Sequence, residues 1–254
     1  MNQGENNMTK VALVTGGSKG IGYAAAKALY QMDYIVVVVA RDEAKLTACA
    51  EGFDPQRFIT HAADVADPAS VRALFARIEQ DYGRLDILFN NAGNNSPAKS
   101  VEEIAYDEWL RVFNVNVHAS FLCAQEAIKI MKTQCPMGGR IINNASISAM
   151  TPRLYSAAYT ASKHAITGLT KAISLDCRQY NIACGQINIG NAETEMSGRM
   201  RKGVYQADGS IQPEAMMDVA DVAAAIAMMA ALPASTNVLE MTIMANEMPF
   251  VGRG

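Results

Sequence analysis

Tyr159 and Lys163 stand four residues apart, a spacing that places two side chains on one face of a helix. A tyrosine hydroxyl ordinarily titrates at about pH 10, but a nearby ammonium group favours the phenolate. The pair therefore suits general acid–base catalysis, in which the tyrosine protonates a carbonyl oxygen. Because the chain has nine tyrosines, this spacing also arises by chance, and it means little alone.

Ser146 precedes Tyr159 at the end of an apolar run, where its hydroxyl could bind a substrate oxygen and orient it. Ser148 is a nearby alternative, although a serine that caps a turn is its simpler interpretation. Asn116 is a poor helix former among apolar neighbours. It is either a satisfied buried amide or a residue that bends the helix, holds a water and continues a proton relay. Asn114, its competitor, has the pattern of a peripheral helix residue.

A glycine-rich turn joins a short apolar run to a helical pattern between Val11 and Leu29. Gly16 permits a tight turn, Gly20 lets a diphosphate approach the backbone, and Gly22 allows helix and strand to pack closely. Strand, glycine turn and helix together present free N–H groups to a phosphate. The spacing G-x-x-x-G-x-G meets the general dinucleotide fingerprint only approximately, so an ordinary α/β turn is the alternative.

Apolar runs alternate with helical patterns along the rest of the chain. The predicted strands cover residues 11–14, 35–39, 58–62, 85–89, 140–145, 183–189 and 239–244. The predicted helices cover residues 23–29, 41–49, 67–82, 107–131, 159–178 and 218–232. This alternation predicts an α/β fold, a single-domain Rossmann-type doubly wound parallel sheet of about seven strands with helices on both faces. We expect one domain over residues 10–254, preceded by a disordered polar arm, residues 1–9.

Ligands of such sheets bind at the carboxyl ends of the strands, and the unusual residues of this chain fall there. They are the glycine turn, Arg41, Asp64, residues 90–93, Ser146 and residues 190–194. This convergence is stronger evidence for a site than any single motif.

Composition argues against several other classes of protein. A net charge of −3 gives no electrostatic case for nucleic-acid binding. The five cysteines and three histidines form no metal-ligand motif, so we expect no metal and buried free thiols in a reducing cytoplasm. We expect no signal peptide, since the polar start has no basic and apolar stretch, and no apolar run of about 18 residues predicts a membrane span.

Taken together, these motifs resemble those of the short-chain dehydrogenase/reductase family over residues 10–194, and more loosely to the end. The resemblance rests on Thr15-Gly16-x-x-x-Gly20-Ile21-Gly22, Asp64, Asn90-Asn91-Ala92-Gly93, Asn116, Ser146 and Tyr159-x-x-x-Lys163. It implies that Tyr159 is the acid/base, Ser146 binds the substrate oxygen and Asn116 belongs to the relay. Lys163 would hold the nicotinamide ribose and lower the pKa of Tyr159.

The cofactor-binding residues follow from the same resemblance. They are Gly16, Ser18, Lys19, Gly20, Ile21, Gly22, Arg41, Asp64, Val65, Asn91, Ala92, Gly93, Tyr159, Lys163, Ala192 and Thr194. Gly190 and Thr194 match the stretch that binds the carboxamide, but Ile189 replaces the usual proline and Ala192 the usual valine or isoleucine.

The end of the second strand predicts NADP(H) rather than NAD(H). Ala40 stands where NAD-preferring relatives carry an aspartate, and Arg41 can bind a 2′-phosphate with its charged donor fork. We expect Lys19 to reach the same phosphate from the other side, and Asp42 to face solvent as a helix-start residue.

Residues 194–218 lose periodicity and suggest a substrate lid. Residues 94–97 and 150–154 would line the same cleft. Arg199, Arg201, Lys202 and Arg153 could recognise an anionic substrate, although a solvated surface is the commoner reason for such a run.

We therefore predict an NADP(H)-dependent enzyme that interconverts a ketone and a secondary alcohol. A 3-oxoacyl-thioester reductase, whose partner would be an acyl carrier protein, is the enzymatic alternative. A non-catalytic NADP-binding redox sensor is the alternative of another class, and an intact Ser146, Tyr159 and Lys163 argue against it. The family resemblance and the apolar C-terminal segment predict a homo-oligomer, a tetramer or possibly a dimer.

Overall fold

The computed structural model describes residues 9–195, 197–201 and 203–251. The predicted N-terminal arm lies outside the described residues except for Thr9. Among the described residues, no helix is both long and apolar enough to cross a membrane.

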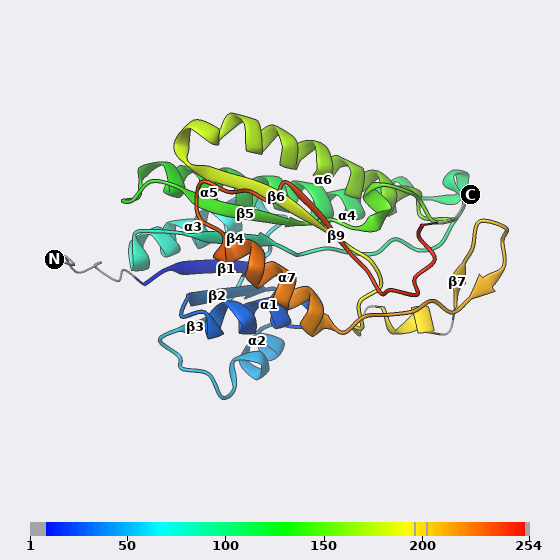
Figure 1. Ribbon diagram of the computed structural model, residues 1–254, viewed down its shortest axis with the longest axis horizontal. Helices are drawn as coiled ribbons and strands as arrows, with labels where there is room; N and C mark the ends of the chain where they lie inside the picture. The colour runs from blue at the N-terminus through cyan, green and yellow to red at the C-terminus, as the bar shows by residue number, and fades with distance from the viewer. Residues whose placement is uncertain (1–8, 196, 202, 252–254) are drawn as a thin grey trace.

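A seven-stranded parallel sheet forms the centre of the fold, as predicted (Figure 1). Its spatial order is β3-β2-β1-β4-β5-β6-β9, so the order reverses between β1 and β4. The strands are β1 (Val11–Thr15), β2 (Ile35–Ala40), β3 (Phe58–Ala62), β4 (Ile87–Asn90), β5 (Gly139–Asn144), β6 (Ile182–Ile189) and β9 (Glu240–Ile243). In a doubly wound sheet, this reversal point is where ligands bind.

Helices cover both faces of the sheet. The helices are α1 (Gly20–Gln31), α2 (Glu43–Ala50), α3 (Pro68–Tyr82), α4 (Tyr106–Phe113), α5 (Ala119–Thr133), α6 (Ala157–Asp176) and α7 (Val219–Ala231). α1, α2 and α7 pack on one face, and α3, α5 and α6 on the other (Figure 1).

β2 shows why the sheet is buried on both sides. Its side chains alternate between the two cores: Val36 and Val38 contact one, and Val37 and Val39 the other. A continuous β-branched run satisfies two apolar faces at once, which is typical of a central parallel strand.

α3 begins and ends where its sequence signals predict. The Asp67 side chain accepts a hydrogen bond from the backbone N–H of Ser70 at 2.7 Å, and Pro68 occupies the first helical position. Gly83, with φ of 66°, ends the helix in the left-handed conformation.

The predicted long helix over 107–131 is interrupted. A π-helical turn, Asn114–His118, joins α4 to α5, and buried Asn116 lies within it. The expected bend at Asn116 therefore takes the form of a local change in helical pitch, as π-turns at functional sites often do.

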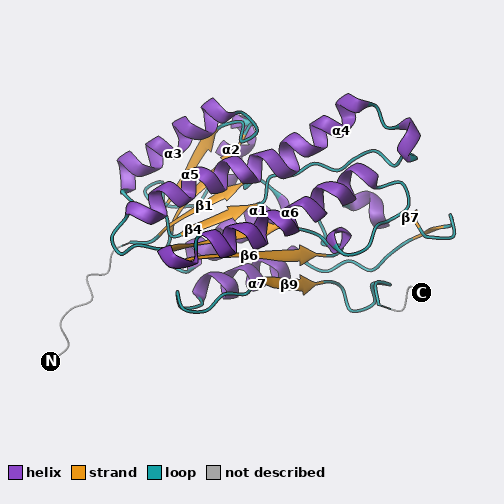
Figure 2. Cartoon of the chain, turned by 90° about the horizontal axis from the view of Figure 1, so that it is seen from above, coloured by secondary structure: helices purple, strands orange, loops and turns teal. Residues whose placement is uncertain are grey.

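Residues 194–218 are more regular than their sequence predicts. They contain a 3₁₀ turn, Gly198–Arg201, and an antiparallel hairpin of β7 (Val204–Tyr205) and β8 (Ile211–Gln212). Two-residue strands are too short to show a period in the sequence, and the rest of the segment is irregular, as predicted; its role as a substrate lid stays a prediction. Figure 2 shows β7 beyond the ends to which the arrows of β6 and β9 point.

Candidate active site

Two cavities meet at Tyr159. The larger cavity, about 730 Å³, runs along the carboxyl ends of β1, β2 and β4. The smaller cavity, about 320 Å³, lies between the loop after β5 and the β7–β8 hairpin. Tyr159, Asn95, Ile189 and Gly190 line both, so a molecule in one cavity can contact a molecule in the other.

The glycine turn forms one end of the larger cavity and leaves no room for side chains. A Cβ on Gly22 would lie 2.4 Å from the carbonyl oxygen of Gly16, and a Cβ on Gly16 would lie 3.0 Å from the Cα of Ala92. Asn91 fixes this approach, because its Nδ2 donates to the carbonyls of Thr15 and Gly16 at 2.9 and 3.1 Å. α1 begins at Gly20 and directs its first N–H groups to the cavity, which fits a dinucleotide diphosphate.

Arg41 and Asp42 follow β2 and also line the larger cavity. The Asp42 carboxylate caps α2 by accepting from the backbone N–H of Lys45 at 3.1 Å, and its Oδ2 lies 3.2 Å from the Lys45 ammonium. These hydrogen bonds lower the pKa of Asp42. Asp42 is thus an exposed helix-start residue, as expected, and its charge is engaged by Lys45 rather than by Arg41.

Lys19 has a partner that the sequence did not indicate. Its ammonium lies 2.6 Å from Oε2 of Glu195, and both side chains are exposed. Lys19 and Glu195 line the larger cavity, where their pair joins the glycine turn to the segment after β6.

Tyr159 and Lys163 lie on one face of α6, as their spacing predicts. The Lys163 ammonium is 5.6 Å from the centre of the Tyr159 ring and donates to the carbonyl of Asn144 at 2.8 Å. Burial lowers the pKa of Lys163 to about 8.

The pKa of Tyr159 is raised rather than lowered. Burial raises it, while a hydrogen bond with Ser146 and the charge of Arg153 act in the opposite direction without overcoming burial. The expected lowering by Lys163 was wrong for this arrangement, because burial of the phenol dominates.

Ser146 reaches Tyr159 from the end of β5. It is the N-cap of a 3₁₀ turn, Ile147–Ala149, and its Oγ accepts from the backbone N–H of Ser148 at 3.1 Å. The capping role considered for Ser148 is therefore performed by Ser146. Ser148 is also buried and lines the smaller cavity.

The Asn116 side chain contacts the loop after β4 rather than Tyr159 or Lys163. Its Oδ1 accepts from the N–H of Asn94 at 2.7 Å, and its Nδ2 donates to the carbonyl of Asn94 and to Oγ of Ser162, both at 3.0 Å. It thereby ties the loop that lines both cavities to α6.

The larger cavity brings together nearly all of the cofactor-binding residues expected from the sequence. Its lining includes Gly16, Ser18, Lys19, Gly20, Ile21, Gly22, Arg41, Asp64, Val65, Asn91, Ala92, Gly93, Tyr159, Lys163 and Thr194. Ala192 is the exception: it is buried and pairs with Met217 in an isolated β-bridge.

Sequence reasoning missed Asn144 and Asn191. Asn144 orients Asn91 through a 2.8 Å hydrogen bond and supplies the carbonyl that holds Lys163. Its place at the last position of a central strand was the available signal. Asn191 lines the smaller cavity, and the sequence places it directly after Gly190.

The smaller cavity contains part of the expected cleft. Residues 95, 96, 153 and 154 line it, and Tyr155 and Tyr205 form an edge-to-face aromatic pair at its wall, with ring centres 5.1 Å apart. Of the basic residues proposed for an anionic substrate, Arg153 lines the cavity and Arg201 is paired with Glu193 at the surface. Lys202 and the side chain of Arg199 lie outside the described part of the chain. In that described part, no three His, Cys, Asp or Glu side chains are grouped to hold a metal ion.

Comparison with known proteins gives one consistent family. The family model described as short chain dehydrogenase matches residues 10–204. A 3beta-hydroxysteroid dehydrogenase of Mediterraneibacter gnavus is 38% identical over 194 residues, which are 75% of this chain and 68% of that protein. A D-beta-hydroxybutyrate dehydrogenase of Rhizobium meliloti is 33% identical over 193 residues, 74% of each chain.

Two solved structures share the whole architecture. The 3-ketoacyl-(acyl-carrier-protein) reductase of Brucella melitensis, complexed with NADH, superposes with a TM-score of 0.82 at 28% identity, covering 92% of this chain and 96% of that one. A single-residue variant of actinorhodin polyketide ketoreductase with NADPH gives 0.83 at 27% identity, covering 93% and 96%.

Proposed function

The chain belongs to the short-chain dehydrogenase/reductase family, and we propose that it is an NADP(H)-dependent enzyme whose Tyr159 is the general acid/base. As an oxidoreductase of this family it interconverts a ketone and a secondary alcohol. The observation that carries the proposal is the position of Tyr159 between the two cavities, hydrogen-bonded to Ser146. A substrate oxygen in the smaller cavity would contact the hydroxyl groups of both Ser146 and Tyr159.

Each residue has a distinct role in this proposal. Ser146 binds the substrate oxygen and orients it, and Tyr159 gives that oxygen a proton in reduction or removes one in oxidation. Lys163 binds ribose hydroxyls of the cofactor with the N–H bonds that Asn144 does not use. Asn116 holds the loop that contains Asn94 in place. Its role in a proton relay is part of this proposal. When bound in the larger cavity, the nicotinamide cofactor supplies or accepts the hydride.

The end of β2 supports a preference for NADP(H). Arg41 lines the larger cavity, Ala40 provides no carboxylate, and Asp42 is engaged by Lys45. A 2′-phosphate near Arg41 would therefore gain a charge-assisted, planar donor pair. Lys19 contributes less than its position in the sequence suggests, because Glu195 already binds its ammonium.

Two substrate classes compete. The relatives named as steroid and hydroxybutyrate dehydrogenases favour a small or medium free ketone or alcohol. The reductase of Brucella melitensis, whose name specifies a 3-ketoacyl group on an acyl carrier protein, favours a 3-oxoacyl thioester. We favour the free ketone, because Arg201, a candidate contact for such a carrier, is already paired with Glu193.

The test is an assay of ketones, alcohols and 3-oxoacyl thioesters with each nicotinamide cofactor, using wild type and Tyr159→Phe. We expect Tyr159→Phe to bind NADPH normally and to lose about 10² to 10⁴ in turnover. Tyr106→Phe, which removes a hydroxyl from an exposed tyrosine, is the matched control and should retain wild-type activity. Turnover of Tyr159→Phe within twofold of wild type would remove Tyr159 from the mechanism.

We further propose that the protein is a homo-oligomer of the reducing cytoplasm. Exposed Phe121 on α5 and Leu175 on α6 place apolar side chains on the helices of one face. Such surface is usually covered by a second copy. All five cysteines are free, in keeping with a reducing compartment. A monomeric mass in light scattering at micromolar concentration would contradict the oligomer.

A further inference from the structure

Arg153, Asn191 and Glu214 form a closed ring of hydrogen bonds beside the smaller cavity. Arg153 Nη2 donates to Glu214 Oε2 at 2.6 Å and to Asn191 Oδ1 at 2.9 Å. Asn191 Nδ2 donates to the same Glu214 Oε2 at 2.8 Å. The three residues come from the loop before α6, the segment after β6 and the segment after β8, so tertiary folding assembles the ring.

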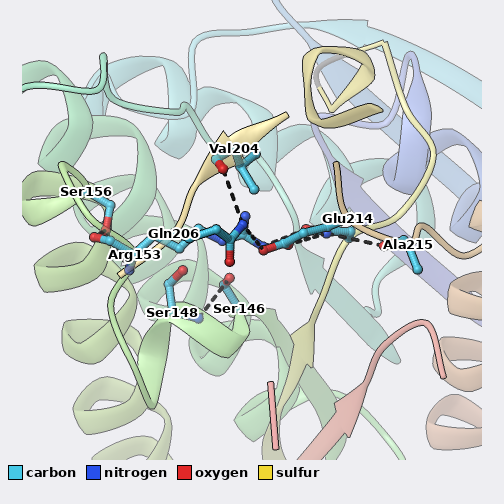
Figure 3. Close-up of polar contacts among 9 residues, drawn as sticks. Ser146, Ser148, Arg153, Ser156, Val204, Gln206, Glu214 and Ala215 are labelled. Atoms are coloured by element: carbon cyan, nitrogen blue, oxygen red, sulfur yellow. Dashed lines mark hydrogen bonds and ion pairs between the residues drawn. The ribbon is translucent and has the colours of Figure 1, made fainter. Parts of the chain in front are cut away.

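The ring is joined to the β7–β8 hairpin. Gln206 Nε2 donates to Glu214 Oε1 and to the carbonyl of Val204, both at 3.2 Å (Figure 3). Val204 and Tyr205 line the smaller cavity, so the ring is continuous with that part of its wall.

Glu214 is a buried, charged carboxylate. Its side chain is 1% exposed, compared with 15% for Arg153. Burial raises the pKa of Glu214, but the hydrogen bond from Asn191, the charge of Arg153 and the hydrogen bond from Gln206 together hold it below its ordinary value. Glu214 therefore stays ionised at neutral pH and compensates the charge of Arg153.

Arg153 is held in the ring through one of its two terminal nitrogens, and its charge is compensated there by Glu214. Its Nη2 uses both N–H bonds within the ring, and its Nη1 is buried without a hydrogen-bond partner among the described residues. Arg153 is also the single charged side chain among the described residues that line this cavity. The other polar groups there are serine and tyrosine hydroxyls and asparagine amides, which bind neutral oxygen atoms.

We propose that this ring makes the enzyme selective for uncharged ketones, and that Glu214 is the residue that rejects a carboxylate-bearing substrate. An incoming carboxylate would lose its water in the cavity and find the guanidinium already neutralised by a buried carboxylate. The inference deepens the proposed function, because it takes the smaller cavity as the substrate site. The sequence left open whether Arg153 binds an anionic substrate. In this proposal Arg153 is part of the wall of the smaller cavity, with its charge compensated by Glu214, and does not bind an anion.

The test uses two ketones of nearly identical shape, para-acetylbenzoate and para-acetylbenzamide. The acid and the amide differ by a full charge while the number of heavy atoms is equal. We expect wild-type kcat/KM with NADPH to be lower for the acid by about a hundredfold. Calorimetry on the enzyme saturated with NADP⁺ should give the same order of affinities without any turnover.

Glu214→Gln is the informative variant, since it keeps the shape and removes the charge. It should raise kcat/KM for the acid, because Arg153 then carries an uncompensated charge. The ratio of kcat/KM for the amide to kcat/KM for the acid should fall at least tenfold. Glu193→Gln, which removes an arginine-paired carboxylate at the surface, is the matched control and should keep the wild-type ratio.

Three results would overturn the proposal: equal or better use of the acid by wild type, an unchanged ratio in folded Glu214→Gln, or failure of both compounds to bind. If Glu214→Gln does not fold, as judged by circular dichroism, the proposal is tested by the ratio of wild-type kcat/KM values for the amide and the acid. Binding of the amide without any reduction would instead contradict the proposed function and leave the selectivity standing.

Discussion

Lys163 has a buried ammonium group, and this burial should make the stability of the protein depend on pH. The residue is 6% exposed, and its pKa falls from 10.5 to about 8 in the folded protein. The unfolded chain therefore binds the proton more strongly than the folded chain. The resulting destabilisation is complete below pH 8 and disappears as the pH rises through 10.5.

The perturbation that isolates this effect is Lys163→Met, which removes the titrating group. With one pKa unit worth about 1.4 kcal/mol, raising the pH from 7 to 9.5 should stabilise wild type relative to Lys163→Met by about 2 kcal/mol. Lys171→Met, which removes an exposed lysine from the same helix, is the matched control for loss of a lysine side chain.

The assay is urea unfolding without cofactor at several pH values and one protein concentration, followed by the fluorescence of the single tryptophan, Trp109. The quantity compared is the free energy of unfolding of wild type minus that of the variant. A difference that stays constant or falls as the pH rises would refute the buried-ammonium reasoning.

Three further outcomes are expected. Ser146→Ala removes a hydrogen bond that lowers the pKa of Tyr159, so the rising limb of the pH profile for alcohol oxidation should move to higher pH; movement to lower pH would contradict this role. Arg41→Ala should raise KM for NADPH at least about tenfold more than KM for NADH, and parallel changes would exclude Arg41 from phosphate binding. Gly22→Ala should abolish NADPH binding in a fluorescence titration, because its Cβ would lie 2.5 Å from Asn91 Nδ2; retained affinity would show that the turn can adjust.

The positions of several strands and helices follow from local sequence. The four valines of β2 alternate between two apolar cores, so their pattern requires a strand buried on both faces. Asp67 and Pro68 start α3 through short-range hydrogen bonding and a fixed φ angle. Tyr159 and Lys163 share a face because the α-helical repeat places residues four apart together.

Other features needed the folded chain because their partners are distant in sequence. Lys19 pairs with Glu195 across 176 positions, which local spacing cannot show. The π-helical turn at Asn116 depends on packing and on hydrogen bonds to the loop after β4. The spacing of Tyr159 and Lys163 predicted a lowered pKa for Tyr159. Burial, which is established only when α6 packs on the sheet, raises that pKa instead.

The substrate side shows the division most clearly. The sequence by itself places Ser146 and the Tyr159–Lys163 pair, because strand ends and helical repeats are local properties. Tertiary structure alone brings Glu214, 61 positions from Arg153, against its guanidinium. A charge that reads as an anion receptor in the sequence is thereby neutralised, since the effect of a charge depends on its surroundings in the fold.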